Sequence, residues 1–138
     1  MQEKFKKPHK TAIQRNKLSV PMRYLSENDL LVGRVLDYGC GKGYDAQELD
    51  LESYDPYWQT EMPKGKFDTI TCNYVLNVVS ESIQEEIIKD IRCRLKKAGR
   101  AYISVRSDIK NDTNTQRCVY LDESQVQVKG CRMYIIEK

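Results

Sequence analysis

The sequence predicts an α/β protein whose sheet is mostly parallel and ends in an antiparallel edge at the C-terminus. Short β-type runs alternate with helix-type segments between residues 21 and 105, and one glycine-rich loop joins the first run to a helix. Two further β-type runs close the chain without a helix between them. Alternation favours parallel strands with right-handed crossovers, whereas a final strand pair favours antiparallel pairing.

The composition indicates one folded domain. The chain has 138 residues, 40% of them hydrophobic, which suffices for a single core but leaves no room for a second domain. No apolar run approaches the roughly 20 residues that cross a membrane. The basic N-terminus is not followed by the apolar stretch of a secretory signal. We therefore expect a cytoplasmic protein without a membrane segment.

Positive charge is concentrated at the N-terminus. The net charge is +3, yet residues 1–17 hold six Lys or Arg against one acid, so this segment carries about +5. We treat residues 1–20 as a basic N-terminal arm and residues 21–138 as the folded domain. Such an arm attracts the phosphates of nucleic acids, although a solvated terminal charge run is also common.

The cysteines indicate a reduced compartment rather than a metal site. The five thiols, at positions 40, 72, 93, 118 and 131, form no Cys-x-x-Cys pair, and an odd number leaves one unpaired in any disulfide scheme. The single histidine, His9, lies in the basic arm. We expect the cysteines to act as small buried hydrophobes and no metal to be bound.

The N-terminal half predicts two short helices and two short strands. Apolar residues at mostly helical spacing, interrupted by Pro21, predict a helix over 21–31 that Gly33 ends. Residues 34–38 are a β-type run entering the glycine loop, and a brief helix over 44–50 follows. The next strand, 51–54, ends at Asp55-Pro56 because proline stops ladder pairing.

The C-terminal half predicts one long helix among the remaining strands. After a loop over 57–66, residues 67–72 are a strong β-type run. A helix over 80–95 carries its apolar residues on one face, acids near its start, and lysines and glycine at its end. Further strands are expected over 101–105, 118–121 and 132–136, with a loop over 107–116.

The glycine loop is the central chemical feature. A strand leads through Asp37 into Gly39-x-Gly41-x-Gly43 and then into a helix, so the glycines let a ligand approach the backbone at a helix N-terminus. A dinucleotide loop would have the spacing Gly-x-Gly-x-x-Gly, and a Walker phosphate loop is absent. The spacing therefore disfavours a nicotinamide cofactor.

Four segments, in order, resemble motifs of the class I S-adenosylmethionine (SAM) dependent methyltransferases. Val35–Gly43 resembles the first motif, and Asp55 lies where these enzymes carry an acid that holds the two ribose hydroxyls. Phe67–Val79 resembles the fourth-strand motif, whose end faces the methionine part of SAM. Leu95–Ile103 resembles the turn into the fifth strand. The resemblance implies a Rossmann-like three-layer sandwich with SAM as cofactor.

The resemblance also implies which residues hold SAM and its product, S-adenosylhomocysteine (SAH). The three loop glycines would border methionine and ribose, Asp55 would bind the ribose, and Pro56 or Tyr57 would lie against adenine. Cys72 and Asn73 would line the floor near the methionine. Ordinary turn and strand-end chemistry is the alternative for each. The implied cofactor-binding residues are Arg15, Asp37, Gly39, Cys40, Gly41, Gly43, Asp55, Pro56, Tyr57, Cys72 and Asn73.

The sequence departs from the family pattern at the third strand. Between Asp55 and Phe67 there is little room for that strand or for its acid, which reads the adenine amino group. Glu61, Asp68 or backbone groups would have to replace it. The sheet is therefore expected to be trimmed around the third strand, as in the small stand-alone methyltransferase-like proteins of phage and bacterial genomes.

Asn73 and Tyr74 are the candidate catalytic residues, because they follow a strand at the carboxyl edge of the sheet. Methyl transfer mainly requires a nucleophile held in line and close, so a dedicated base is optional. Arg15 and Ser19 are candidates to fold over the pocket and pair with the methionine carboxylate. Other substrate-side candidates are Trp58, Arg106 and Asp108.

The sequence leaves the methyl acceptor open among nucleic acid, protein and small molecule. The segment starting at Asn73 lacks both prolines of an Asn-Pro-Pro-Tyr motif, which disfavours a standard DNA adenine methyltransferase. The basic segment 1–17 and the lack of an inserted cap domain favour a large or anionic acceptor, with a small acceptor as the alternative. A non-catalytic or partner-dependent SAM-binding protein, or a SAM-degrading enzyme, is the other function considered. A monomer and a dimer both fit.

Overall fold

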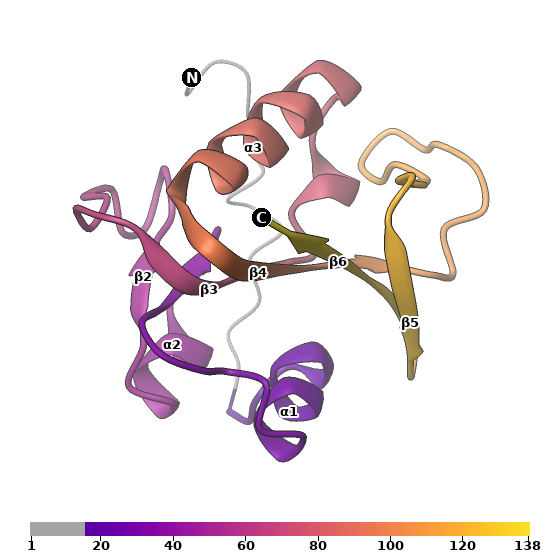
Figure 1. Ribbon diagram of the computed structural model, residues 1–138. Coiled ribbons are helices and arrows are strands. Elements are labelled where there is room, and N and C mark those ends of the chain that lie inside the picture. Colours follow the sequence, from indigo (N-terminus) through magenta and orange to yellow (C-terminus); the bar gives the residue numbers. More distant parts are fainter. Residues whose placement is uncertain (1–15) are drawn as a thin grey trace.

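The computed structural model describes residues 16–138, which contain one six-stranded sheet (Figure 1). Its strands are β1 (Val35–Tyr38), β2 (Glu52–Tyr54), β3 (Phe67–Asn73), β4 (Leu95–Arg106), β5 (Ser124–Val128) and β6 (Cys131–Glu137), in the order β2-β1-β3-β4-β6-β5. The first four pair in parallel, whereas β6 pairs antiparallel with both β4 and β5. The predicted mostly parallel sheet with an antiparallel C-terminal edge is confirmed.

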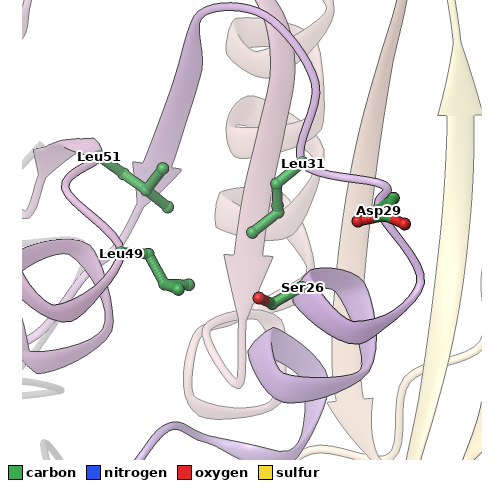
Figure 2. Close-up of a pocket in the computed structure, with 5 residues that line it drawn as sticks. All are labelled: Ser26, Asp29, Leu31, Leu49 and Leu51. Atoms are coloured by element: carbon green, nitrogen blue, oxygen red, sulfur yellow. The ribbon is translucent and has the colours of Figure 1, made fainter.

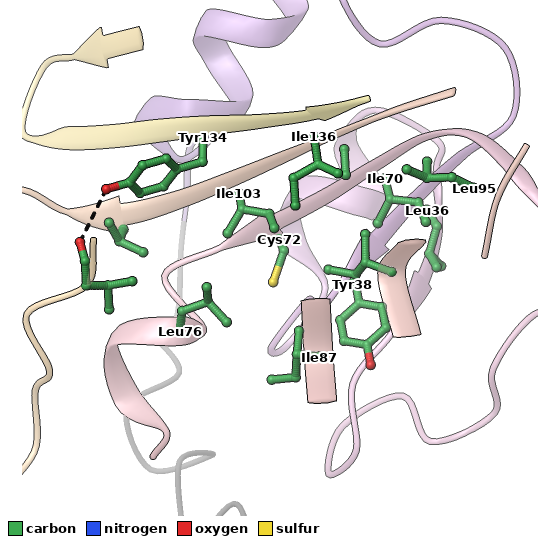
Figure 3. Packing of buried hydrophobic residues seen from close by; sticks show 14 of the residues in the cluster. Leu36, Tyr38, Ile70, Cys72, Leu76, Ile87, Leu95, Ile103, Tyr134 and Ile136 are labelled. Carbon is green, nitrogen blue, oxygen red and sulfur yellow. Dashed lines mark hydrogen bonds between the residues drawn. The ribbon is translucent and has the colours of Figure 1, made fainter. Parts of the chain in front are cut away.

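Helices cover both faces of this sheet. They are α1 (Val20–Glu27), α2 (Tyr44–Glu48) and α3 (Glu81–Arg94), and a single 3-10 turn, η3 (Leu76–Val78), precedes α3. Helices α1 and α2 lie on one face and α3 on the other (Figure 1). The larger core lies on the α3 side and includes Leu36, Cys72 and Ile87 (Figure 3). A smaller core on the α1 side includes Met22 and Met133.

The apolar pattern explains where the helices pack. Ile83, Ile87 and Ile91 recur every four residues of α3, and all three are buried against the sheet. Pro21 stands in the first turn of α1, where its missing N–H costs no hydrogen bond, so it does not interrupt the helix. Met22 and Leu25 then bury the inner face of α1.

Helices α1 and α2 end in the same way, and earlier than expected. In α1 the N–H of Leu30 donates to the carbonyl of Leu25 at 3.0 Å, and in α2 the N–H of Leu51 donates to the carbonyl of Ala46 at 2.7 Å. These are Schellman bonds, which close a helix around one left-handed residue. That residue is an aspartate in both helices, with φ of 56°. The prediction that Gly33 ends the first helix was therefore wrong.

Strand β2 is a free edge of the sheet, as the missing third strand predicts. In the described chain, the connection from β2 to β3 adds only one isolated bridge, between Asp55 and Gln59. The start of β2 is held instead by a side-chain fork, in which Arg34 donates to both carboxylate oxygens of Glu52 at 2.6 and 2.7 Å. The expected trimming around the third strand is confirmed.

Two strand boundaries near the C-terminus differ from the prediction. Strand β4 begins at Leu95, because the chain pairs with β3 before and after a bulge at residues 96–99. The strand expected over 118–121 is absent, and β5 occupies Ser124–Val128 instead. Val119 is buried and its carbonyl accepts a bond from Arg132, so this segment packs under the sheet rather than beside it. The exposed glutamines of β5 interrupt the apolar pattern from which strands are predicted, so this strand was not expected.

The five cysteines are free thiols. Only Cys72 and Cys131 are buried, whereas Cys93 is exposed and the other two are partly exposed, so the expectation of buried hydrophobes holds for two of them. Within residues 16–138, no helix has the length and apolar character needed to cross a membrane.

The aspartate at the end of α2 provides a test of the helix endings. A left-handed residue other than glycine is strained, so Asp50→Gly is expected to raise the free energy of unfolding by roughly 0.5–1 kcal/mol. Asp50→Ala keeps a Cβ atom at this position and is expected to give no gain. Urea denaturation of both variants and the wild type measures the difference, and equal stability of the two variants would contradict it.

Candidate functional site

The carboxyl ends of the parallel strands meet at one edge of the sheet, and the glycine loop leaves β1 at this edge. The N–H groups of Gly39 and Cys40 both donate to the carbonyl of Tyr54 at the end of β2, at 2.7 and 3.0 Å. The loop therefore crosses over the end of the neighbouring strand. Ligands of open α/β sheets bind in this position.

The loop conformation requires glycine at two of its positions. Gly39 has φ of 79°, and a Cβ atom there would collide with the side chain of Val75. Gly43 has φ of 86° and caps the N-terminus of α2. Val75 fills the space beside Gly39, whereas the space beside Gly43 is open, so a ligand can approach the backbone closely at Gly43.

Asp55 ties the loop to the segment that follows β2. One carboxylate oxygen accepts the N–H of Gly41 at 2.9 Å, and the other accepts the N–H groups of Tyr57 and Trp58 at 2.9 and 3.0 Å. A carboxylate has about four lone-pair positions, so acceptor capacity remains for a ligand with hydroxyl groups. Asp55, which is expected to bind the ribose, therefore lies next to the glycine loop, which is expected to border the same ribose.

Asp37 is buried under the loop. Burial raises the pKa of its carboxyl to about 7, the Thr71 hydroxyl that donates to it at 3.0 Å opposes this shift, and the charges of Asp45 and Asp55 add to it. Burial, together with Asp37 and Asp55, also raises the pKa of the Cys40 thiol to about 12. Three carboxyl groups thus surround the loop, and this environment favours a cationic ligand.

Ser19 occupies a different place from the one expected. It is buried, and its N–H and its hydroxyl donate to the two carboxylate oxygens of Asp45 at 2.9 and 2.7 Å. The side chain joins the start of α1 to α2, so the prediction that Ser19 pairs with a methionine carboxylate is wrong. The chain that leads from the basic arm therefore enters the fold beside the glycine loop. Arg15 lies outside the described residues.

Asn73 and Tyr74 end β3 two strands away from Asp55. Both polar atoms of the Asn73 carboxamide are buried and have no hydrogen-bond partner among the described residues. Tyr74 has φ of 61°, a left-handed conformation that costs energy in a tyrosine, and its N–H donates to the carbonyl of Ser104 at 2.8 Å. Unpaired buried groups and local strain are both typical of functional sites.

Sequence reasoning missed Ser104, which is register neighbour to Asn73 on β4. It is fully buried, and its hydroxyl lies beside the buried Cys131 thiol. A single serine between isoleucine and valine in an apolar strand was the available signal. Its significance depends on strand pairing, which the sequence does not show.

The structure places Cys72 on the other side of the sheet from Asn73. Its side chain is completely buried in the α3 core (Figure 3). The thiol therefore does not line the floor of the site, and only the backbone of Cys72 is available there. The alternation of side chains along β3 explains this, because Thr71 and Asn73 share one face and Cys72 takes the opposite one.

An exposed aromatic pair follows Asp55. Tyr57 and Trp58 are 56% and 41% exposed, and their rings meet edge to face with centroids 4.9 Å apart. The ammonium group of Lys42 lies 5.2 Å from the Trp58 ring. With Pro56, which is partly buried, this pair flanks the end of β2. The expected contact of Pro56 or Tyr57 with adenine stays a prediction.

Of four other candidates, three have partners of their own and one is exposed. Asp68 lies at the amino end of β3 and accepts bonds from the Arg34 N–H at 2.7 Å and from Lys96 at 3.2 Å, so it cannot replace the adenine-reading acid. Glu61 is exposed in the connection after β2. Arg106 and Asp108, at the end of β4, bind each other through two hydrogen bonds of 3.0 and 2.6 Å.

A pocket of about 270 Å³ lies at the opposite end of the molecule (Figure 2). It is lined by Ser26, Asp29, Leu31, Leu49 and Leu51. These residues belong to the ends of α1 and α2 and to the segments entering β1 and β2, so the pocket lies near the amino ends of these strands. It is a gap between two helix endings and not part of the site.

The buried carboxyl of Asp37 predicts a pH dependence of stability. Its pKa is raised from 3.8 to about 7 in the folded protein, so its contribution is most favourable at low pH and is lost as the pH rises through this range. Asp37→Asn is expected to remove this loss of stability, which amounts to at most about 4 kcal/mol in the free energy of unfolding. Urea denaturation across this pH range measures it.

The matched control is Glu52→Gln. In the wild type, the hydrogen bond from Arg34 lowers the pKa of Glu52 below its usual value of 4.5. The stability that the Glu52 carboxylate contributes is therefore lost only as the pH falls below 4.5. The control is expected to keep the wild-type slope between pH 4.5 and about 7. An identical slope in Asp37→Asn and the wild type would contradict the assignment to Asp37.

Comparison with known proteins agrees with this geometry. A family model described as a methyltransferase domain matches residues 11–135. The comparison with curated proteins gives no match. The solved DhpI–SAH complex has a TM-score of 0.58 at 13% identity, covering 97% of this chain and 94% of that one.

Two further solved structures are similar to this chain over different shares of their length. The N-methyltransferase NodS from Bradyrhizobium japonicum WM9, solved with SAH, has a TM-score of 0.55 at 13% identity over 85% of this chain and 83% of that chain. The chain spans only 21% of the length of PKMT2 from Rickettsia typhi, at 21% identity over 54% of this chain and a TM-score of 0.40. The family model and the shared fold confirm the prediction made from the four motifs: the chain belongs to the methyltransferase domain family, with the Rossmann-like fold of the class I SAM-dependent enzymes.

Proposed function

We propose that this chain is a methyltransferase that binds SAM along the carboxyl edge of its sheet and methylates a nucleic acid. The observation that carries the proposal is the arrangement of this edge, which aligns Asp55, the glycine loop and the unpartnered carboxamide of Asn73 in the order of strands β2, β1 and β3. A ligand with a hydroxylated end and a cationic end matches this order of groups.

The residues at the edge fit SAM in charge and in shape. The remaining lone pairs of Asp55 suit the two ribose hydroxyls, and the space beside Gly43 is open. Asp37 and Asp45 add carboxyl groups close to the loop, which suits a ligand carrying sulfonium and ammonium charges. Bound SAM supplies a methyl group on a sulfonium, which leaves as a neutral thioether.

The strand order indicates where the acceptor enters. Neighbouring strands lie about 4.8 Å apart, so the end of β3 is about 10 Å from the end of β2. With the ribose at Asp55, the reactive end of the cofactor extends toward β3 and β4. Asn73 and Tyr74 then face the acceptor, and they would orient it rather than remove its proton.

Two features favour a nucleic acid as acceptor. The basic segment 1–17 carries about five positive charges, and Ser19 fixes its point of entry beside the glycine loop through two bonds to Asp45. Lysines and arginines near a site attract phosphate backbones. In residues 16–138 the long connection 107–123 packs on the α3 side, through Val119 and Leu121, and leaves the loop side without an inserted domain.

SAM binding is tested by isothermal titration of SAM and SAH against the wild type and Asp55→Asn. Loss of one charged acceptor is expected to weaken binding roughly 10- to 100-fold, since hydrogen bonds to a charged group contribute about 1.5–3 kcal/mol. Glu52→Gln, on the same strand but bonded to Arg34, is expected to bind like the wild type. Absence of wild-type binding would remove the proposal.

The acceptor is tested with labelled SAM and purified DNA and RNA at several salt concentrations. Labelling of nucleic acid that declines steeply with salt is expected, because the basic segment acts through phosphate contacts. Labelling of protein or of a small molecule alone would contradict a nucleic-acid acceptor. Release of methylthioadenosine without any acceptor would instead identify a SAM-degrading enzyme.

A further inference from the structure

Strand β5 is the second free edge of the sheet. It lies at the end opposite β2 (Figure 1), and in the described chain residues 124–128 make no backbone–backbone hydrogen bond beyond their pairing with β6. Free edges are normally protected by a charge, a proline or a bulge. The five residues of β5 are uncharged, include no proline and pair with β6 without a bulge. The edge is therefore open to another strand.

The hairpin between β5 and β6 determines which backbone groups face outward. Two turn residues separate Val128 from its partner Cys131. In a hairpin of this length the closing pair exchanges both of its backbone hydrogen bonds, and such pairs alternate along the ladder. The even-numbered residues of β5 therefore bond to β6. The N–H and carbonyl groups of Gln125 and Gln127, which are both exposed, point away from the protein.

We propose that β5 is a homodimer interface, at which β5 of a second copy of this chain pairs antiparallel about Val126 and joins the two sheets. The inference goes beyond the proposed function, because it concerns assembly and not the cofactor or the acceptor. In this register Gln125 of one copy lies opposite Gln127 of the other, so their outward groups exchange two hydrogen bonds at each end. The same surface meets itself, as a two-fold dimer requires.

The charges that flank β5 select this register. Glu123 precedes the strand and Lys129 follows it at equal distances from Val126, so each Glu123 lies opposite Lys129 of the other copy. Lys129 is exposed and has no ion pair among the described residues. Glu123 binds Arg92 through one carboxylate oxygen at 2.8 Å, which leaves the other oxygen available. A register shifted by two residues would separate both charge pairs.

The side chains of β5 also match across the proposed interface. Val126 packs on the smaller core beside α1, so pairing about this residue brings two valines together and extends that core. Gln125 and Gln127 lie on the opposite face, where their carboxamides can bind each other.

The other free edge is less suited to pairing. Strand β2 has three residues and begins at the charged pair of Glu52 and Arg34. The β5 interface is itself small, because a five-residue strand buries less than the roughly 1,200–2,000 Å² of a standard complex. We therefore expect a dimer that forms at micromolar concentrations.

Exchanging the flanking charges tests the register. Glu123→Lys and Lys129→Glu each place like charges at both ends of the interface, so each is expected to raise the dimer dissociation constant roughly tenfold. Sedimentation equilibrium of the full chain measures this constant. An equimolar mixture of the two variants pairs opposite charges again at both ends and is expected to restore wild-type association. Mixing cannot restore the bond to Arg92 within one chain, so recovery separates an interface from a structural role.

Gln125→Pro tests the backbone pairing. Proline removes an N–H that no bond within the sheet uses, and edge strands tolerate it there. The dimer loses one hydrogen bond from each copy, so the dissociation constant is expected to rise at least tenfold. Gln125→Ala, which keeps the N–H, is the matched control and is expected to associate like the wild type.

Two results would overturn the inference. One is a wild type that stays monomeric at millimolar concentration; slow hydrogen exchange at Gln125 and Gln127 in that monomer would show that a segment of the same chain covers the edge. The other is a dimer that neither the charge variants nor Gln125→Pro weaken, which would place the contact elsewhere. SAH titration separates the two proposals: we expect equal affinity in every variant, and absence of binding would remove the proposed function without affecting the dimer.

Discussion

The bond between the Asp55 carboxylate and the Gly41 N–H is the interaction on which the site depends. Strand β2 has only three residues and no neighbour on its outer side in the described chain, so pairing alone holds it weakly. Charged groups anchor both of its ends, with Arg34 on Glu52 at the start and Asp55 on the glycine loop at the finish. Such charge-assisted bonds are stronger than neutral ones. They replace the support that a third strand would give.

The carboxyl groups around the glycine loop, together with other groups at this edge, lower the stability of the protein when no ligand is bound. Asp37 is buried, and its carboxyl feels the charges of Asp45 and Asp55 across the loop. Tyr74 is strained, and Asn73 buries both polar atoms of its carboxamide without a partner among the described residues. Each of these features opposes folding. A cationic ligand would offset the cost at Asp37, and a hydrogen-bonding ligand would offset the cost at Asn73. Stability lost for function is common at active sites, and here the losses gather at one edge of the sheet.

The parts of the fold that sequence predicted are those set by neighbouring residues. The glycine loop, Asp55 and the spacing of isoleucines in α3 are local patterns, and the structure has each element there. The pairs that sequence missed join distant positions, such as Ser19 with Asp45 and Asn73 with Ser104. They depend on strand register and helix docking. Cys72 is a different kind of miss. It was expected to line the floor of the site, although side-chain alternation along β3 was enough to assign it to the core.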